Sequence, residues 1–140
     1  MNKDKHFYNW VKGESTQLSP HFTTNEFTCL CRFSTCINQR TSIELIARLE
    51  LLHIKFGKPI TVTSGFRCHE YQIDLGQRGY ETAKIISQHE LGMAADIVSS
   101  NLKDLAKLSD PLFKAMGVGK TFIHVDMRED KLRRWTYART

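Results

Sequence analysis

Hydrophobic side chains recur at helical spacing between residues 41 and 56, and this segment is the clearest helix that the sequence predicts. Its periodic apolar positions are Ile43, Ile46, Ala47, Leu49 and Ile54. Thr41 and Glu44 have the spacing of a capping box, and Gly57 followed by Pro59 stops the helix. We therefore expect a helix over this segment with signals at both ends.

Other apolar stretches have the composition or the alternation of β-strands. The expected strands are residues 60–63, 93–98, 121–127 and 134–137, the last paired beside the third. Successive side chains of a strand point to opposite sides, so His124 and Asp126 are expected to share one face.

Shorter helices and loops fill the remainder of the chain. The expected helices are residues 7–11, 68–75, 101–108 and 110–117, and the expected loops are residues 13–20 and 76–86. Asn101 with Asp104 caps the third of these helices, and Asp110-Pro111 starts the fourth. Short strands interleaved with helices predict an α+β fold, with a mostly antiparallel sheet flanked by helices.

The length of 140 residues fits one domain with a single core. We expect residues 1–19 to be an N-terminal extension and residues 20–140 to be the domain. No apolar run approaches the roughly 20 residues that cross a bilayer. The first residues are basic but lack the apolar core of a secretory signal, so no signal peptide is visible.

Twenty Lys and Arg against fifteen Asp and Glu give a formal net charge of +5. That excess favours polyanions such as nucleic acid, an anionic membrane surface or a bacterial cell wall. The basic residues are scattered, as on a solvated face, and the one tight group is Lys131, Arg133 and Arg134. We therefore expect no nucleic-acid partner.

Two imidazoles and a carboxylate stand in two short segments of the chain. His89 and Asp96 belong to the first segment, and His124 follows in the second. A catalytic zinc site takes three ligands of these types and keeps one position for a water, whose pKa falls towards 7. A spacing of His-x6-Asp alone is a weak signal. The small residues Gly92, Ala94 and Ala95 between the first two ligands strengthen it, because they let the backbone turn closely around a cation.

These motifs together resemble the zinc D-Ala-D-Ala carboxypeptidases of peptidase family M15. The resemblance covers roughly residues 20 to 128 and rests on residues 87–96 (SQHELGMAAD), 122–126 (FIHVD) and 64–67 (SGFR), with 57–60 (GKPI) leading into the last. It implies a zinc ion on His89, Asp96 and His124. It also implies the fold of the zinc domain of hedgehog signalling proteins.

Amide hydrolysis needs a proton acceptor, and Asp126 is our candidate because it shares the strand face of His124. The alternative is that Asp126 only orients a ligand or pairs with Arg128. The better-known family pattern has an acidic residue three positions before the last ligand, where this chain has Thr121. The substitutes for the base are Glu90 and Glu81.

Two further residues are candidates for contact with substrate. Arg67 stands where the family carries an arginine that contacts the substrate or the reacting carbonyl, and a guanidinium can bind a terminal carboxylate in bidentate fashion. An arginine at a strand end is also often only a surface ion pair. Ser87 either binds substrate near the metal or caps the turn before His89.

Four cysteines form a second group of candidate ligands: Cys29, Cys31, Cys36 and Cys68. They could bind a second, structural zinc ion, form up to two disulfides or remain free thiols. The Cys-x-Cys spacing differs from the usual zinc knuckle, and reduced thiols are the default without a signal peptide. We favour a structural role that ties the N-terminal loop to the helix after Arg67.

Two other motifs are rejected. Residues 117–121 (GVGKT) lack the glycine that a phosphate loop needs at position 114, where Lys114 stands. The residue types of a serine triad are present, but no nucleophile elbow accompanies them.

The sequence therefore predicts a monomeric zinc metallopeptidase that cleaves peptidoglycan stem peptides near a D-amino acid. Carboxypeptidase activity and cell-wall endopeptidase activity, as in an endolysin, both remain open. Without a visible signal peptide, we expect the chain to be cytoplasmic until its release to the cell wall, or phage-encoded. The alternative is a non-catalytic, zinc-containing binding module of the same fold.

Overall fold

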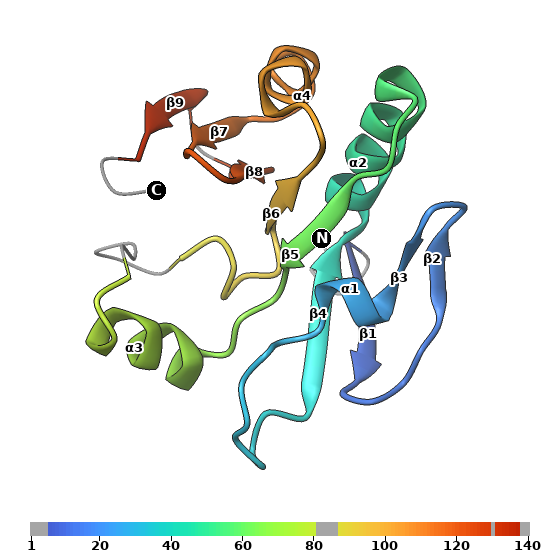
Figure 1. Cartoon of the computed structure of the whole chain (residues 1–140). Helices are drawn as coiled ribbons and strands as arrows, with labels where there is room; N and C mark the ends of the chain where they lie inside the picture. The colour runs from blue at the N-terminus through green and yellow to red at the C-terminus, as the bar shows by residue number, and fades with distance from the viewer. Residues whose placement is uncertain (1–5, 81–86, 130, 138–140) are drawn as a thin grey trace.

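A five-stranded sheet with the strand order β5-β6-β8-β7-β9 lies at the centre of the fold (Figure 1). The computed structural model describes residues 6–80, 87–129 and 131–137. The strands of this sheet are β5 (Thr61–Ser64), β6 (Ala94–Val98), β7 (Ala115–Val118), β8 (Ile123–Asp126) and β9 (Arg133–Thr136). Neighbouring strands run antiparallel except β7 and β9, which are parallel. This arrangement confirms the predicted α+β class and the mostly antiparallel sheet.

Four helices accompany the strands in the described part of the chain. They are α1 (Thr24–Phe27), α2 (Ile43–Phe56), α3 (His69–Gln77) and α4 (Leu102–Ser109). Figure 1 shows α2 and α4 on one side of the five-stranded sheet and α3 on the other. None of the helices among the described residues combines the length and the apolar character needed to cross a bilayer.

The N-terminal segment forms two small antiparallel sheets. β1 (Phe7–Val11) pairs with β4 (Asn38–Ser42), and β2 (Gln17–Ser19) pairs with β3 (Phe22–Thr23). The predicted helix at residues 7–11 is therefore wrong, as is the loop over the whole of residues 13–20. The physical reason is a long-range contact. β1 forms hydrogen bonds with a strand some 30 positions later, and its Trp10 is buried. The Trp10 indole N–H also donates to Thr28 Oγ1 at 2.9 Å.

The long helix begins two residues later than the sequence predicts. Thr41 pairs with Tyr8 in the β1–β4 ladder, so it cannot cap the helix. Ser42 is the N-cap instead, and its Oγ accepts the backbone N–H of Leu45 at 3.1 Å. The predicted stop is confirmed, because Gly57 adopts φ 71° and donates its N–H to the carbonyl of His53.

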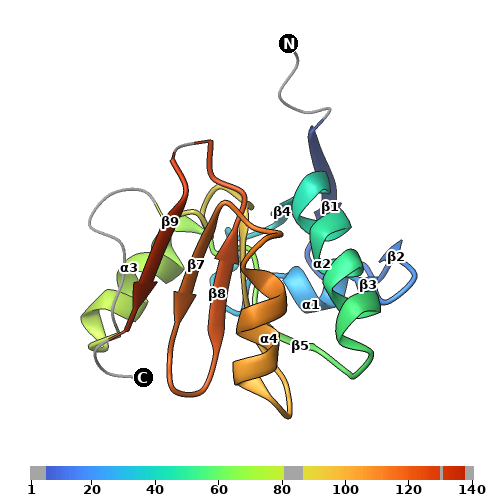
Figure 2. The same ribbon diagram turned by 90° about the horizontal axis from the view of Figure 1, so that it is seen from above.

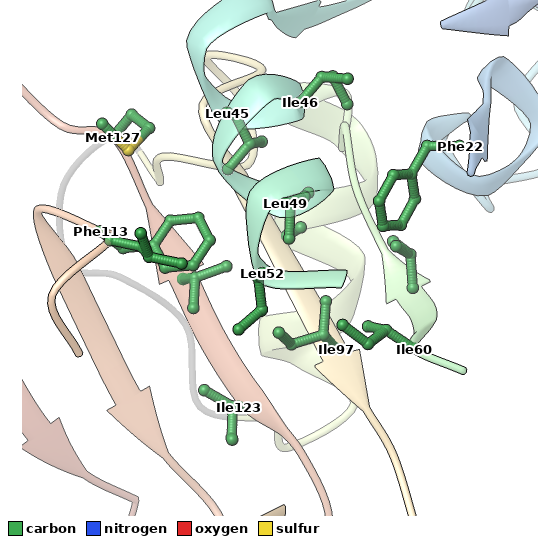
Figure 3. Packing of buried hydrophobic residues seen from close by; sticks show 14 of the residues in the cluster. Phe22, Leu45, Ile46, Leu49, Leu52, Ile60, Ile97, Phe113, Ile123 and Met127 are labelled. Carbon is green, nitrogen blue, oxygen red and sulfur yellow. The ribbon is translucent and has the colours of Figure 1, made fainter. Parts of the chain in front are cut away.

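The core lies between α2, α4 and one face of the five-stranded sheet. Figure 3 shows Leu45, Leu49 and Leu52 of α2 facing Ile97 and Ile123 of the sheet. All five side chains are fully buried. Burial of one such side chain contributes about 1.5–3 kcal/mol, so this face holds the sheet and helix in a fixed relation.

The later elements agree with the sequence prediction in five cases and differ in two. β5, α3, β6, α4 and β8 confirm the strand, helix, strand, helix and strand expected there, within two residues at each end. The helix expected at residues 110–117 is wrong, because residues 115–118 form β7 and bond to both β8 and β9. The last strand, β9, pairs with β7 rather than beside β8, as Figure 2 shows. Most of the expected loop at residues 76–86 lies outside the described residues.

The two faces of the sheet carry different chemistry. Ala95 and Ile97 of β6 and Ile123 and Val125 of β8 point into the core. The residues between them along the strands, including Asp96, therefore point to the opposite face of the sheet. Polar side chains that would be costly in the core are in this way gathered on one surface of a rigid sheet.

Candidate metal centre

Three side chains with metal-binding atoms converge on the face of the sheet opposite the core. Asp96 on β6 and His124 on β8 are direct cross-strand partners, and His89 comes from the turn before β6. Asp96 Oδ1 lies 3.2 Å from His89 Nε2 and 3.1 Å from His124 Nδ1. One ligand atom from each residue lies within 4.8 Å of the others, and all three residues are buried. The structure thus brings together the three residues that the sequence pattern selected.

Backbone hydrogen bonds hold the turn that carries His89. The N–H of Gly92 donates to the carbonyl of His89 at 3.2 Å, and the carbonyl of Gly92 accepts the N–H of Ser42 at 2.7 Å. Gly92 has φ 73°, and an added Cβ would lie 2.7 Å from the carbonyl oxygen of Arg40. A side chain at this position would therefore force the turn apart.

Ser87 stabilises the same turn. Its Oγ accepts the backbone N–H of His89 at 3.2 Å, and the residue is buried. This contact supports turn capping, the second of the two roles that the sequence left open for Ser87.

The carbonyl of Gly65 fixes the orientation of the His89 ring. His89 Nδ1 lies 2.7 Å from that oxygen and must be its protonated donor, which leaves Nε2 free to bind a metal. The backbone of Gly65 packs closely against that of Phe27, because a Cβ added to Gly65 would lie 2.6 Å from the Phe27 Cα. The absence of a side chain at Gly65 therefore permits the close approach that places its carbonyl.

Asp126 orients His124 in the same manner. Its Oδ2 lies 2.7 Å from His124 Nε2, and Nδ1 on the other edge of the ring faces Asp96. Arg128 occupies the remaining acceptor positions of Asp126, with Nε 2.9 Å from Oδ1 and Nη2 2.7 Å from Oδ2. The Asp126 side chain is fully buried. These contacts match the orienting role that was the alternative to a base role.

Arg67 binds the second carboxylate oxygen of Asp96. Its Nη2 donates to Asp96 Oδ2 at 3.0 Å, and its Nε donates to Ser64 Oγ at 2.9 Å. Among the described residues, Nη1 makes only a long contact of 3.4 Å with Gln72 Oε1. Arg67 therefore holds Asp96 in place and retains donor capacity at one end of the guanidinium.

The surrounding charges set the protonation of the three candidate ligands. Burial lowers the pKa of His89 despite the nearby Asp96 carboxylate, so the ring is neutral at neutral pH. Burial alone would raise the pKa of Asp96, but its electrostatic interaction with His89 and the hydrogen bonds from His124 and His89 hold it well below its usual range. Burial would lower the pKa of His124, yet hydrogen bonds to Asp126 and Asp96 raise it.

The same balance keeps Asp126 ionised. Burial opposes ionisation, but the hydrogen bonds from Arg128 and His124 hold the pKa of Asp126 below its ordinary value. A carboxylate this strongly stabilised is a weak proton acceptor near neutral pH.

The spacing of the three ligand atoms fits a zinc ion. Nitrogen and oxygen ligands lie about 2.0–2.2 Å from tetrahedral zinc, which places neighbouring ligand atoms roughly 3.3 Å apart. The separations of 3.1 and 3.2 Å measured from Asp96 Oδ1 agree with that geometry. The donor set of two imidazoles and one carboxylate is also the set that catalytic zinc sites use.

A row of cross-strand partners extends the site across the whole sheet. It runs Ser64, Asp96, His124, Gly117 and Trp135 through β5, β6, β8, β7 and β9. Because Gly117 has no side chain, the Trp135 indole lies over it, with its ring centroid 5.4 Å from that of His124. The sequence reasoning missed Trp135.

Tyr137 follows Trp135 at the same edge of the site. The two ring centroids are 6.0 Å apart. Burial, followed by the charge of Asp96, raises the pKa of Tyr137 to about 12, so its hydroxyl is a protonated donor at neutral pH. The Trp-x-Tyr spacing is the signal in the sequence that could have pointed to this pair, because two side chains two positions apart on a strand share one face.

Glu90 and Glu81 are the two other candidate bases, and Thr121 stands where the better-known family pattern has its acidic residue. Glu90 faces His69, with 3.3 Å between Oε2 and Nδ1. Thr121 is exposed in the connection before β8. Glu81 lies outside the described residues.

Comparison with known proteins gives one family match. The family model described as Peptidase M15 matches residues 20–126 of this chain, and no curated protein matches it. The matched range includes His89, Asp96, His124 and Asp126.

Proposed function

The chain belongs to the M15 peptidase family, and from this premise we propose that it hydrolyses peptidoglycan peptides next to a D-amino acid. Members of this family are zinc-dependent metallopeptidases, so the substrate is a peptide and the reaction is hydrolysis. The observation that carries the proposal is the convergence of His89, Asp96 and His124 at zinc-binding distances on one rigid sheet.

In this proposal the zinc ligands are His89 Nε2, Asp96 Oδ1 and His124 Nδ1. Zinc held there supplies Lewis acidity and a nucleophilic water near neutral pH. Gly65 and Asp126 keep each histidine in the tautomer and orientation that ligation requires. Arg67 keeps Oδ2 of Asp96 occupied, so that Oδ1 remains turned to the histidines.

We assign substrate contact to the edge of the site formed by Arg67, Trp135 and Tyr137. The guanidinium of Arg67 keeps a weakly engaged Nη1, which suits a carboxylate or a carbonyl oxygen of the substrate. Trp135 offers an aromatic surface beside His124. The protonated hydroxyl of Tyr137, whose pKa burial and the charge of Asp96 raise, can donate a hydrogen bond at the same edge of the site.

Two observations favour cell-wall peptides over other peptides. The motifs around the three ligands and at residues 64–67 resemble those of zinc D-Ala-D-Ala carboxypeptidases. The net charge of +5 also favours adsorption to an anionic cell wall. Carboxypeptidase action and endopeptidase action, as in an endolysin, would use the same centre.

Digestion of purified peptidoglycan tests this function. We expect the zinc-loaded protein to release fragments whose masses, by mass spectrometry, correspond to cleavage beside a D-residue. The matched control is Asp96→Asn, which keeps the size of the side chain but removes the charge that binds the metal. If the unmutated protein binds zinc but cleaves no peptidoglycan and no synthetic stem peptide, the chain is a zinc-containing binding module and the proposal is wrong.

A further inference from the structure

Four cysteine side chains from two segments of the chain converge in a cluster separate from the three candidate zinc ligands. Cys29, Cys31 and Cys36 belong to the segment between α1 and β4, and Cys68 is the N-cap of α3. Their sulfur atoms all lie within 4.8 Å of one another. The first three residues are buried, and they pack together with Cys68, Phe66 and Tyr71.

The separations between the sulfurs match a tetrahedral zinc ion. Cys68 Sγ lies 3.8 Å from Cys29 Sγ and 3.7 Å from Cys31 Sγ. Thiolates bind zinc at about 2.3 Å, so neighbouring sulfurs of a tetrahedral site are roughly 3.8 Å apart. A disulfide would need a separation of about 2.05 Å. The cluster therefore has the spacing of metal ligands and not of bonded pairs.

Three hydrogen-bond donors point at these sulfurs. The backbone N–H of Cys68 donates to Cys29 Sγ at 3.3 Å, and the Lys12 ammonium lies 3.4 Å from Cys31 Sγ. The amide of Gln39 donates to Cys36 Sγ at 3.4 Å. A thiol sulfur is a weak acceptor, so donors on three of four sulfurs are better explained by thiolates. A metal ion is what allows several buried thiolates to exist side by side.

Gln39 also fixes the relation between two of the ligands. It is 2% exposed, and its Oε1 accepts the backbone N–H of Cys29 at 2.8 Å while its Nε2 reaches Cys36. A buried polar side chain thus ties the backbone of Cys29 to the sulfur of Cys36.

We propose that Cys29, Cys31, Cys36 and Cys68 bind a second zinc ion with a structural role. Four thiolates complete a tetrahedral sphere and leave no position for water, which distinguishes a structural site from a catalytic one. The positive charge of Lys12 beside Cys31 offsets part of the excess negative charge of four thiolates. This inference does not depend on the peptidase activity.

The second ion would also support the first centre. Cys68 directly follows Arg67, whose Nη2 holds Asp96, and whose backbone N–H donates to the carbonyl of His89 at 3.1 Å. The same segment contains Gly65, which orients His89. The backbone N–H of Phe66 donates to the carbonyl of Phe27 at 2.9 Å, two residues before Cys29. A zinc ion that joins Cys29 to Cys68 would therefore restrain the segment whose residues position His89 and Asp96.

Metal and thiol counting on the unmutated protein tests the proposal without any variant. The protein is purified with reductant and dialysed against a weak chelator, which removes ions held loosely by the partly exposed group His21, Glu50 and His53. We expect two zinc ions per chain and four thiols that react with a thiol reagent only after denaturation with a strong chelator. One zinc ion with four freely reactive thiols, or a protein mass that corresponds to disulfides, would overturn it.

Variants assign the ions to their sites. Cys36→Ser should lower the zinc content from two to one, and His124→Ala should lower it from two to one independently. Ser34→Ala, in the same loop and exposed, is the matched control and should keep both ions. Cobalt substitution adds a spectroscopic readout: thiolate-to-cobalt charge-transfer absorption should persist in His124→Ala and disappear in Cys36→Ser. Absence of that band from the unmutated cobalt protein would contradict the proposal even if the cysteine variant fails to fold.

Discussion

The carboxylate of Asp126 is hydrogen-bonded to His124 Nε2 at 2.7 Å, on the edge of the imidazole turned away from Asp96. The two residues are separated by one position on β8, so the alternation of the strand places both on the same face. Arg128 binds both oxygens of this carboxylate. Asp126 is therefore positioned to select the tautomer of His124, a candidate metal ligand, and it has little freedom to accept a proton from solvent.

Asp126→Asn should weaken zinc binding at the three-ligand centre by about 10–100-fold, because the partner of a ligating histidine sets its orientation and basicity. Zinc affinity, measured by competition with a chelator, is the readout. The pH profile of kcat/KM measured at saturating zinc should keep its acidic limb. Asp110→Asn is a control, since Asp110 forms an exposed ion pair with Arg134. Unchanged zinc affinity with loss of the acidic limb would instead identify Asp126 as the base.

Arg67→Lys should lower kcat/KM roughly tenfold or more. Lysine cannot reproduce the separate bonds to Ser64 and Asp96, and a hydrogen bond to a charged group contributes about 1.5–3 kcal/mol. Steady-state kinetics on a stem peptide give the value, with Arg48→Lys, at an exposed ion pair on α2, as the control. Activity equal to that of the unmutated protein would show that Arg67 serves neither Asp96 nor the substrate.

Gly117→Ala should displace Trp135 from the site. An added Cβ would lie 2.5 Å from two indole atoms, so the ring or β9 must move. We expect a loss of about 1–3 kcal/mol in the free energy of unfolding and a raised KM, with zinc content unchanged. The same substitution in a Trp135→Ala background should cost less, because the clash is gone. Equal costs in both backgrounds would contradict the contact.

Glu50→Gln should destabilise the fold by about 1 kcal/mol at neutral pH. Glu50 Oε1 accepts hydrogen bonds from Ser19 Oγ at 2.7 Å and from the His21 N–H at 2.9 Å. Burial opposes ionisation, but these bonds and the His21 side chain lower the pKa of Glu50 below its ordinary value of 4.5.

The sign of the pH effect follows from that direction. A carboxylate with a lowered folded pKa contributes stability that is fully present above pH 4.5 and is lost as the pH falls through the folded pKa. Denaturant unfolding of both proteins should therefore give a difference in the free energy of unfolding that shrinks below pH 4.5. Both proteins lose zinc in acid, so that effect cancels in the difference. Glu44→Gln, at an exposed ion pair with Arg48, should show little effect at any pH. A Glu50→Gln difference that stays constant down to pH 3 would refute this reasoning.

Local signals in the sequence were sufficient for the elements whose structure is decided nearby. The stop at Gly57 and the cap at Asn101 depend on residues within one turn of each helix. The three candidate ligands could be selected because two lie in one turn-strand unit and the third has an alternating strand around it.

The errors arose where pairing between strands decides the conformation. Residues 7–11 form a strand because they pair with β4 some 30 positions later, and residues 115–118 form a strand because they pair with both β8 and β9. The sequence left two roles open for Asp126, and its contacts with His124 and Arg128 are seen only in the structure. Trp135 reaches the site only because β9 pairs in parallel with β7 across Gly117.

Diffraction at the zinc absorption edge tests the metal centre most directly. Crystals of the zinc-loaded protein should give an anomalous peak about 2.0–2.2 Å from His89 Nε2, Asp96 Oδ1 and His124 Nδ1, with a fourth position open to solvent. No peak at that point, or a fourth protein side chain that closes the coordination sphere, would contradict a catalytic zinc ion held by these three residues.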